Sequence, residues 1–316
     1  MKFKTMKKIF ILSILLLGIS GLIYHRYSYF IKDWIIRSPF MEFYVKHFRD
    51  GPDIDADHLV TTLDHGEKII LNKHDKCVCW FTRATGHWDS SETKVIERLA
   101  KPGFKVLEVG GNFGVHTLRM GSLVGPNGKV FSFEANPNVS KYLNQSVALN
   151  KFEDRITIFS MALSNESYEG SMVYNLSNIG GGYITPKNTN TVELCQKTLC
   201  APIHVRKLDD VLAENDIDPL SINFLKMDAE GAEFWILQGA SSLIRNKDLL
   251  LMMEYDTNHL ERNKIIPSDF INFLKNAGFS KVYTVQAGGV LQEKSWDDLL
   301  NPIMTADIIL TKGSTL

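Results

Sequence analysis

Short apolar runs alternate with helical patterns over the last two thirds of the chain, and this alternation restricts the fold more than any other feature. Strand-like runs lie at residues 105–110, 128–135, 155–163, 221–230 and 249–255. Segments with apolar residues three or four apart separate most of these runs, as in amphipathic helices. The alternation is typical of a doubly wound, mainly parallel sheet with helices on both of its faces.

The rest of the chain completes this prediction. A helical pattern at residues 267–279 precedes two more strand-like runs at 281–286 and 306–312. We therefore expect an α/β fold with a seven-stranded, mainly parallel, Rossmann-like sheet. Residues 164–207, with many Gly, Asn and Thr, indicate an insertion of loops and short strands, and residues 68–81 are expected to form a β-hairpin.

The predicted first strand ends in a glycine-rich turn formed by Glu108, Gly110, Gly111, Asn112 and Gly114. The order of these glycines does not match the G-x-G-x-x-G pattern of dinucleotide sites, and no lysine follows Gly114 as it would in a P-loop. The turn therefore favours a ligand that has a nucleoside but no phosphate. S-Adenosylmethionine is such a ligand.

Acidic residues at the ends of two strands suit the two ends of that ligand. Glu134, which closes the second strand, is placed to accept both ribose hydroxyls. Glu108 and the carbonyl groups of the glycine turn can face the ammonium and sulfonium charges, because glycine lets the backbone approach closely. Met161 and Ala162 close the third strand and are expected near the adenine.

Six stretches also resemble a known family. They are "VLEVGGNFGVHTL", "VFSFEANP", "ITIFSMALSN", "VRKLDDVL", "INFLKMDAEGAEFWILQGA" and "LLLMMEY". In this order and spacing they are similar to the FkbM family of class I methyltransferases, over about residues 85–311. Many relatives carry Asp where Glu108 stands, which keeps the charge. The resemblance implies an S-adenosylmethionine-dependent O-methyltransferase, a family that often acts on sugar or polyketide hydroxyls.

Methyl transfer to a hydroxyl requires removal of its proton. Asp228 and Glu230, at the end of the fourth strand, are the candidates for the base, and Lys226 could pair with one of them. In a second mechanism Asp228 with Glu254 or Asp256 binds a divalent cation that lowers the pKa of the hydroxyl. We favour the metal-free mechanism, because a full ligand set is not evident.

The amino terminus predicts a membrane segment. Four lysines precede an uncharged apolar run at residues 9–24. As a helix it would span about 24 Å, slightly less than the ~30 Å hydrocarbon core. We expect a single-pass anchor in residues 1–26, followed by a juxtamembrane extension in 27–84 and the methyltransferase domain in 85–316. A cleaved signal with a secreted body is the alternative.

The side of the membrane stays open at this point. Lysines before the apolar run favour export of the body, whereas S-adenosylmethionine is made in the cytosol. A disulfide between Cys195 and Cys200 would suit an oxidising compartment.

Composition restricts the partners of the chain. The formal net charge is −1, and the amino-terminal segment holds five of the cations, so the body is acidic. This argues against nucleic acid as a main partner. The expected acceptor is a sugar, a glycan or a similar small molecule. A protein or lipid acceptor and a catalytically inactive binding protein are the alternatives.

Overall fold

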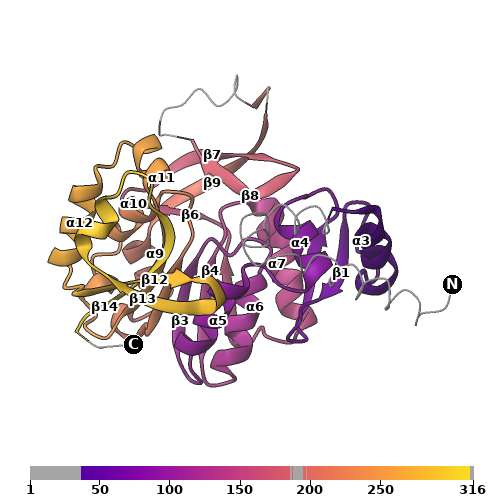
Figure 1. Cartoon of the computed structure of the whole chain (residues 1–316), viewed down its shortest axis with the longest axis horizontal. Helices are drawn as coiled ribbons and strands as arrows, with labels where there is room; N and C mark the ends of the chain where they lie inside the picture. Colours follow the sequence, from indigo (N-terminus) through magenta and orange to yellow (C-terminus); the bar gives the residue numbers. More distant parts are fainter. Residues whose placement is uncertain (1–36, 186, 188–194, 197, 314–316) are drawn as a thin grey trace, which may run out of the picture. The chain divides into compact units, whose positions relative to one another are not determined.

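The structure is a computed structural model that describes residues 37–185, 187, 195–196 and 198–313 (Figure 1). The chain divides into two compact units, Met1–Asp50 and Gly51–Leu316. The first unit contains the helix α3 (Pro39–Tyr44), which continues directly into the π-helix η1 (Val45–Arg49). All the elements described next belong to the second unit.

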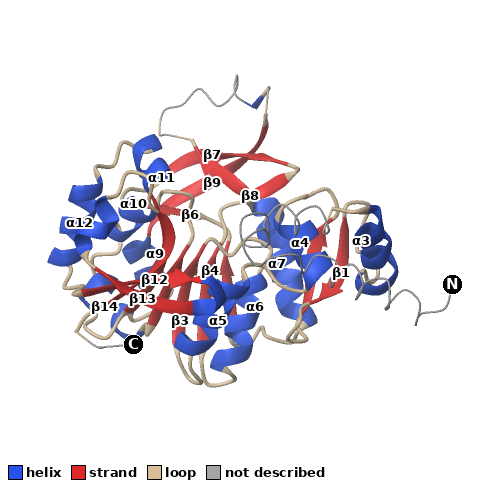
Figure 2. Ribbon diagram, in the orientation of Figure 1, coloured by secondary structure: helices blue, strands red, loops and turns tan. Residues whose placement is uncertain are grey.

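The second unit is built on one large mixed sheet (Figure 2). Its order is β13-β12-β14-β11-β10-β3-β4-β5. The strands are β3 (Lys105–Val109), β4 (Lys129–Phe133), β5 (Ile156–Phe159), β10 (Phe224–Met227), β11 (Leu250–Asp256), β12 (Lys281–Gln286), β13 (Val290–Lys294) and β14 (Thr305–Thr311). The five strands from β11 to β5 in this order are parallel, and β14 lies antiparallel between β11 and β12.

The sheet has eight strands, so the prediction of seven was wrong. The additional strand is β13, which turns back from β12 through a glycine turn and pairs with it antiparallel. The sequence of this strand, "VLQEK", is the one signal from which it could have been predicted. Because β13 lies at the sheet edge and no residue in it is fully buried, it lacks the apolar pattern that marks the other strands.

Helices cover both faces of the sheet, as the alternation predicted. One face carries α5 (Ser90–Leu99), α6 (Val115–Val124) and α7 (Pro137–Leu149). The other carries α9 (Leu208–Glu214), α10 (Glu233–Gln238) and α12 (Pro267–Asn276). In β3, Val106 packs in the core that α5, α6 and α7 cover, and Leu107 packs in the core that α9, α10 and α12 cover. Both are fully buried, which explains why the strands read as continuous apolar runs.

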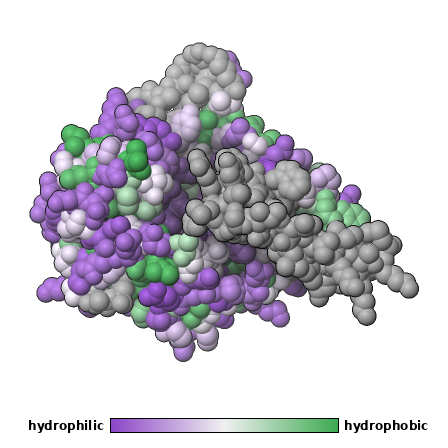
Figure 3. Space-filling model, viewed as in Figure 1, coloured by the Kyte–Doolittle hydropathy of each residue, from purple (hydrophilic) through white to green (hydrophobic). Residues whose placement is uncertain are grey.

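Short helical elements complete this unit. They are α11 (Thr257–Arg262), η2 (Pro219–Ser221), η3 (Leu243–Arg245), η4 (Ala287–Gly289) and η5 (Trp296–Leu300). Helix α11 follows β11 directly and is capped by Asp256, whose side chain accepts hydrogen bonds from the backbone of Asn258 and His259. On the face that Figure 3 shows, the described surface is mainly hydrophilic, with hydrophobic residues in small groups.

The predicted insertion forms a second sheet above the carboxyl edge of the first (Figure 1). Its four strands have the order β6-β9-β7-β8. They are β6 (Ala162–Ser164), β7 (Tyr168–Asn175), β8 (Asn178–Ile184) and β9 (Leu199–Lys207). A disulfide joins Cys195 to Cys200 beside the start of β9.

A small hairpin precedes the large sheet along the chain. It pairs β1 (His58–Thr62) with β2 (Lys68–Asn72) and packs on α7, where Ser146 Oγ accepts a hydrogen bond from Ile70 N at 2.9 Å. The prediction of a hairpin at residues 68–81 was wrong, because only the first half of this segment forms a strand. Its second half starts α4 (Val78–Thr85), since Asp75 Oδ1 accepts from Cys77 N and Cys79 N at 2.9 and 3.0 Å.

The expected amino-terminal anchor at residues 9–24 lies outside the described residues. Among those that the structure describes, no helix has the length and apolar character that crossing a membrane requires. The second unit begins before residue 85, with the hairpin and α4 inside it. The domain limits at residues 26 and 84 stay predictions.

Candidate active site

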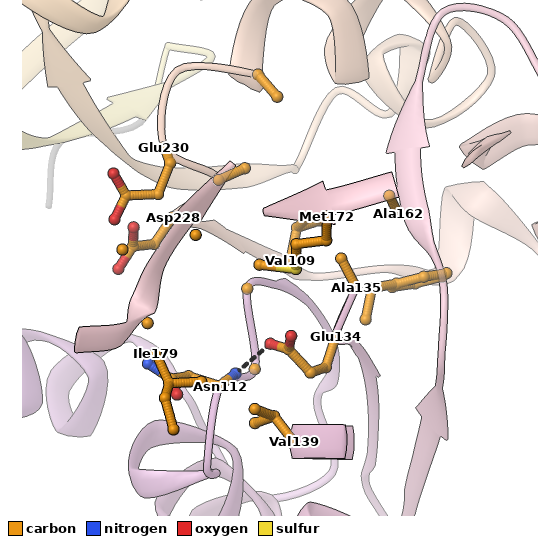
Figure 4. A pocket seen from close by; sticks show the side chains of 18 of the residues that line it. Val109, Asn112, Glu134, Ala135, Val139, Ala162, Met172, Ile179, Asp228 and Glu230 are labelled. Carbon is orange, nitrogen blue, oxygen red and sulfur yellow. Dashed lines mark hydrogen bonds between the residues drawn. The ribbon is translucent and has the colours of Figure 1, made fainter. Parts of the chain in front are cut away.

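A cavity of about 430 Å³ lies at the carboxyl ends of the central strands (Figure 4). All the residues that the sequence assigned to the cofactor and the base line it. They are Glu108, Gly110, Gly111, Asn112, Gly114, Glu134, Met161, Ala162, Lys226, Asp228 and Glu230. They come from four parallel strands and the turns that follow them, which is where doubly wound sheets bind ligands.

Glu108 lies at the floor of the cavity with 1% of its surface exposed. Its Oε2 accepts hydrogen bonds from Thr117 Oγ1 at 2.5 Å and Ser132 Oγ at 2.6 Å. Its Oε1 has no hydrogen-bond partner within the described part of the chain. Burial raises the pKa of Glu108, although the nearby ammonium of Lys226 opposes this. A buried carboxylate oxygen without a donor is suited to a cationic ligand group.

The glycine turn requires glycine at its two ends. Gly110 has φ +86°, and a Cβ there would overlap the backbone carbonyl oxygen of Asp228. Gly114 has φ +103°, and a Cβ there would overlap the side chain of Leu143. These positions therefore bring the turn against the end of β10 and against α7, which leaves the backbone itself as the wall of the cavity.

Glu134 is held by the backbone of two turns. Its Oε2 accepts from Asn112 N at 2.7 Å (Figure 4). Its Oε1 accepts from Asn136 N, also at 2.7 Å. The side chain is buried, and burial raises the pKa of Glu134 to about 7. A carboxylate has about four acceptor sites, so both oxygens can still accept from a ligand hydroxyl.

One end of the cavity is apolar. Ala135, Val139, Ala162 and Met172 line it close to Glu134 (Figure 4). Ala162 and Val139 are 4% and 3% exposed. Met161, which precedes Ala162 in the sequence, is partly buried. A flat heterocycle next to a ribose would fit such a slot, since small and aliphatic side chains cover its faces without competing for hydrogen bonds.

The end of β10 supplies the acidic wall of the cavity. Asp228 and Glu230 lie side by side there (Figure 4), with 44% and 32% of their side chains exposed. Glu230 has φ +53°, a conformation that non-glycine residues rarely adopt. Burial, and then the charge of Asp228, raise the pKa of Glu230 to about 7.

Lys226 is buried beneath these acids. Its Nζ lies 3.3 Å from Glu92 Oε1 and 3.8 Å from Asp228 Oδ2. Burial alone would lower the pKa of Lys226, but the carboxylates of Glu92, Asp228 and Glu108 raise it above its usual range. Lys226 is therefore a fixed positive charge and not a proton acceptor. No sequence pattern pointed to Glu92, because it lies on α5, far away along the chain.

Glu254, the alternative metal ligand, is not among the residues that line the cavity. It lies at the end of β11, with Oε2 3.2 Å from His259 Nδ1. Burial and the charges of Asp228, Glu233 and Glu230 raise the pKa of Glu254 to about 9. Within residues 37–313, leaving aside the undescribed positions, no group of three or more His, Cys, Asp or Glu side chains is arranged to hold a metal ion.

Other segments line the cavity as well. Cys77 and Val78 come from the start of α4, Arg262 and Asn263 from the end of α11, and residues 178–184 from β8. The sequence pattern placed β8 in the predicted insertion at residues 164–207, but it gave no sign that α4 and α11 contribute. Asp75 joins α4 to β8, since its Oδ2 accepts from Ile179 N at 2.7 Å. This contact links positions 104 residues apart, so no local pattern could reveal it.

The strand order β5-β4-β3-β10-β11-β14-β12 places the cavity at the carboxyl edge of a doubly wound sheet, where proteins of this architecture bind nucleotide-like ligands. The comparison with protein families identifies the class of protein to which the chain belongs. The sequence model of the Methyltransferase FkbM domain matches residues 108–281, more than half of the chain. The chain therefore belongs to the FkbM methyltransferase family, as its motifs predicted, and its cofactor is S-adenosylmethionine.

Solved structures that match this chain include the following three proteins. The methyltransferase FkbM from Methylobacillus flagellatus is 14% identical, with a TM-score of 0.40, and the match covers 73% of this chain and 52% of that one. The O-methyltransferase from Bacillus cereus in complex with SAH is 12% identical, with a TM-score of 0.41 and coverages of 77% and 84%. Fibrillarin from Aeropyrum pernix, with bound S-adenosyl-L-methionine, is 12% identical, with a TM-score of 0.40 and coverages of 83% and 99%. No curated protein matches the sequence.

The residues present fit this cofactor. The free Oε1 of Glu108 lies where a cation can be received, and glycine lets the turn beside it pack closely against β10 and α7. Glu134 keeps acceptor capacity beside the apolar slot. Glu108 would hold the ammonium group, Glu134 the ribose and the slot the adenine.

Proposed function

We propose that this chain is an O-methyltransferase that methylates a hydroxyl of a sugar, a glycan or a similar small acceptor. The single observation that supports this most is the shared cavity. It brings the cofactor residues Glu108 and Glu134 together with the acidic pair Asp228 and Glu230. The cofactor end and the base end of the site are therefore part of one space.

In the proposed mechanism Glu230 is the general base. When bound, the cofactor would supply an electrophilic methyl group on a sulfonium, which becomes a neutral thioether on transfer. Glu230 accepts the hydroxyl proton while the acceptor oxygen donates its electron pair to the methyl carbon, in line with the bond that breaks. The pKa of about 7 suits this role, because a base with a pKa near the working pH is ionised and still proton-accepting. The cavity walls would supply the alignment of the reactants.

Asp228 and Lys226 have a supporting role in this proposal. Lys226 carries a permanent charge next to Asp228 and opposite Glu108, its register partner on β3. It therefore offsets part of the negative charge that gathers around the site. Asp228, being paired with Lys226, helps to fix the end of β10 and keeps Glu230 basic.

The acceptor side of the cavity is polar. Asn178 and Tyr183 of β8 line the cavity, and so do Arg262 and Asn263 at the end of α11. Amide, phenol and guanidinium groups recognise hydroxyl-rich molecules by directed hydrogen bonds. This supports a sugar-like acceptor over an apolar one.

An assay with labelled cofactor tests the proposed activity. The purified chain is incubated with S-adenosylmethionine labelled in its methyl group and with panels of glycans, proteins and lipids. We expect label in an alkali-stable methyl ether of a glycan or small sugar. Label only in protein or lipid would identify the other acceptor classes. Cofactor binding in calorimetry with no transfer to any panel would favour an inactive binding protein.

We also propose that residues 9–24 attach the chain to a membrane as a single-pass anchor. The basis is the uncharged apolar run behind four lysines. Alkaline carbonate extraction of membranes tests attachment, and a shortened amino terminus on the mature chain would indicate a cleaved signal. Protease treatment of sealed vesicles then determines the side. If the protease cannot digest the body, the body lies inside the vesicles. If the protease digests it, the body lies on their outer face.

A further inference from the structure

The helix that runs from α3 into η1 carries a row of exposed aromatic side chains. They are Phe40, Phe43, Tyr44 and Phe48, with exposed fractions of 47%, 50%, 39% and 60%. Phe43 stacks on His47 with ring centroids 4.1 Å apart, and Tyr44 stacks on Phe48 at 5.6 Å. Large aromatic side chains are rarely left in water as a contiguous group, so this aromatic row indicates a surface that is covered in use.

The aromatic row occupies one side of the helix only. In α3, at about 100° per residue, positions 40, 43 and 44 fall on one face, and the stacking of Phe43 on His47 and of Tyr44 on Phe48 continues this face into η1. Val45 points to another side and is fully buried. Val45 is the buried residue of α3 and η1, so the aromatic row is separate from the part of the helix that is packed.

Positive charge accompanies the aromatic row. Between positions 37 and 49 the cations are Arg37, Lys46 and Arg49, and the only acid is Glu42. The body of the chain is acidic, so this is a local reversal of charge. Aromatic rings with flanking cations are typical of segments that lie at the boundary between lipid headgroups and acyl chains.

We propose that the aromatic row lies in the interfacial region of a bilayer that contains anionic lipids. This rests on the proposed attachment through residues 9–24. Residues 25–38 join that segment to α3, and this stretch spans at most about 50 Å when fully extended. The helix is therefore kept within reach of the bilayer surface, which raises its effective concentration there. Four side chains on one short helix are too few for a stable protein dimer, which needs about 20–30 residues a side.

The depth of the helix in the bilayer is the measurable consequence. The full-length variants Phe43→Trp and Glu42→Trp are reconstituted into vesicles of phosphatidylcholine and phosphatidylglycerol, with bromine either near the glycerol or near the end of the acyl chains. Residue 43 lies in the aromatic row and residue 42 on the opposite side, and both variants share the five native tryptophans. We expect excess quenching of Phe43→Trp over Glu42→Trp, stronger with the shallow bromine, and weaker when phosphatidylglycerol is omitted.

Three other results would overturn the proposal. If the chain floats with the vesicles but the two variants quench equally, the attachment stands and the interfacial helix is disproved. If the chain does not float with the vesicles, the proposed attachment fails as well. If Phe43→Trp resists quenching and the variant Phe40→Ser, Phe43→Ser, Phe48→Ser changes a dimer into a monomer in sedimentation, the aromatic row is a contact between two copies of this chain.

Discussion

Glu134 shows at the scale of one residue how a buried acid can serve both the fold and the ligand. Each of its oxygens accepts a backbone N–H at 2.7 Å, which fixes the turns that follow β3 and β4. Burial raises its pKa to about 7. A cationic cofactor would favour the ionised form and so recover part of the cost of burying this charge.

We predict that Glu134→Gln weakens S-adenosylmethionine binding by about 10- to 100-fold, because a charged acceptor for the ribose is lost. The amide oxygen can still accept one backbone N–H, so the fold should be retained. Calorimetry measures the dissociation constant, and a melting curve without the cofactor checks the fold. Unchanged affinity in a folded variant would mean that Glu134 does not touch the ligand.

Glu230 gives a prediction for the pH dependence of the rate. A general base works only when it is ionised, so kcat should rise with pH through about 7, the pKa of Glu230. Glu230→Gln should lower kcat by about 100- to 10,000-fold and remove this rise. Stopped assays from pH 5.5 to 9 with the labelled cofactor measure both effects.

The control for Glu230 is Glu261→Gln, an exposed acid on α11. It removes one negative charge from the same region but does not line the cavity. Its rate profile should follow that of the parent chain. A Glu230→Gln variant that keeps the rise near pH 7 would assign the base to another group, with Asp228 as the first to test.

At the scale of one element, the glycine turn gives a prediction about stability. Gly110→Ala adds a Cβ that meets the carbonyl oxygen of Asp228, at φ +86°. Gly66→Ala is the matched control, because Gly66 has φ +100° but nothing within 4 Å of the added atom. The control should lose about 1 kcal/mol of unfolding free energy from backbone strain alone. Gly110→Ala should lose at least about 3 kcal/mol.

Urea unfolding followed by circular dichroism measures both glycine variants. The difference between them isolates the close approach of the turn to β10. Equal losses would show that the backbone at Gly110 can move away from Asp228. In that case the turn would not be the rigid wall of the cavity that its geometry indicates.

The elements also show what a single sequence can predict. The helices and the parallel strands were predictable, because strands that are covered on both faces read as apolar runs, as Val106 and Leu107 do in β3. The position of the expected cofactor residues at the cavity was predictable for a related reason, since they close those strands. Strand β13 was missed because an exposed edge strand has little apolar pattern. The contributions of α4 and α11 were missed because they depend on contacts such as Asp75 with Ile179, which join distant segments.

At the scale of the whole molecule, buried acids with raised pKa values accumulate around one edge of the sheet. Burial raises the pKa of Glu134 and of Glu233 to about 7, and that of Glu254 to about 9. Their ordinary value is 4.5, so each is raised in the folded state. The folded chain therefore holds protons that the unfolded chain has already released. The stability that these protons bring is complete below about pH 4.5 and is lost as the pH rises through the folded values.

His116 sets the lower limit of the pH range in which the stability contribution of the buried acids can be measured by itself. Burial, and then the charge of Lys226, lower the pKa of His116 from 6.5 to about 3. Below pH 6.5 the unfolded chain thus gains a proton that the folded chain refuses, which makes stability rise with pH there and opposes the acids. Above pH 7 His116 is neutral in both states. The contribution of the acids is then seen without this opposing one.

We predict that the melting temperature of the cofactor-free chain falls by about 4 °C between pH 7 and pH 9. Glu254 makes the largest single contribution to this fall, because its pKa of about 9 keeps it protonated longest. Asp307 contributes as well, since burial raises its pKa to about 8. Glu254→Gln should therefore reduce the fall, since the amide stays neutral throughout, whereas the exposed control Glu261→Gln should leave it unchanged. Scanning calorimetry at constant ionic strength measures all three chains. A melting temperature that rises from pH 7 to pH 9 in the parent chain would mean that these carboxyl groups are ionised in the folded state, and that solvent reaches them more freely than their burial indicates.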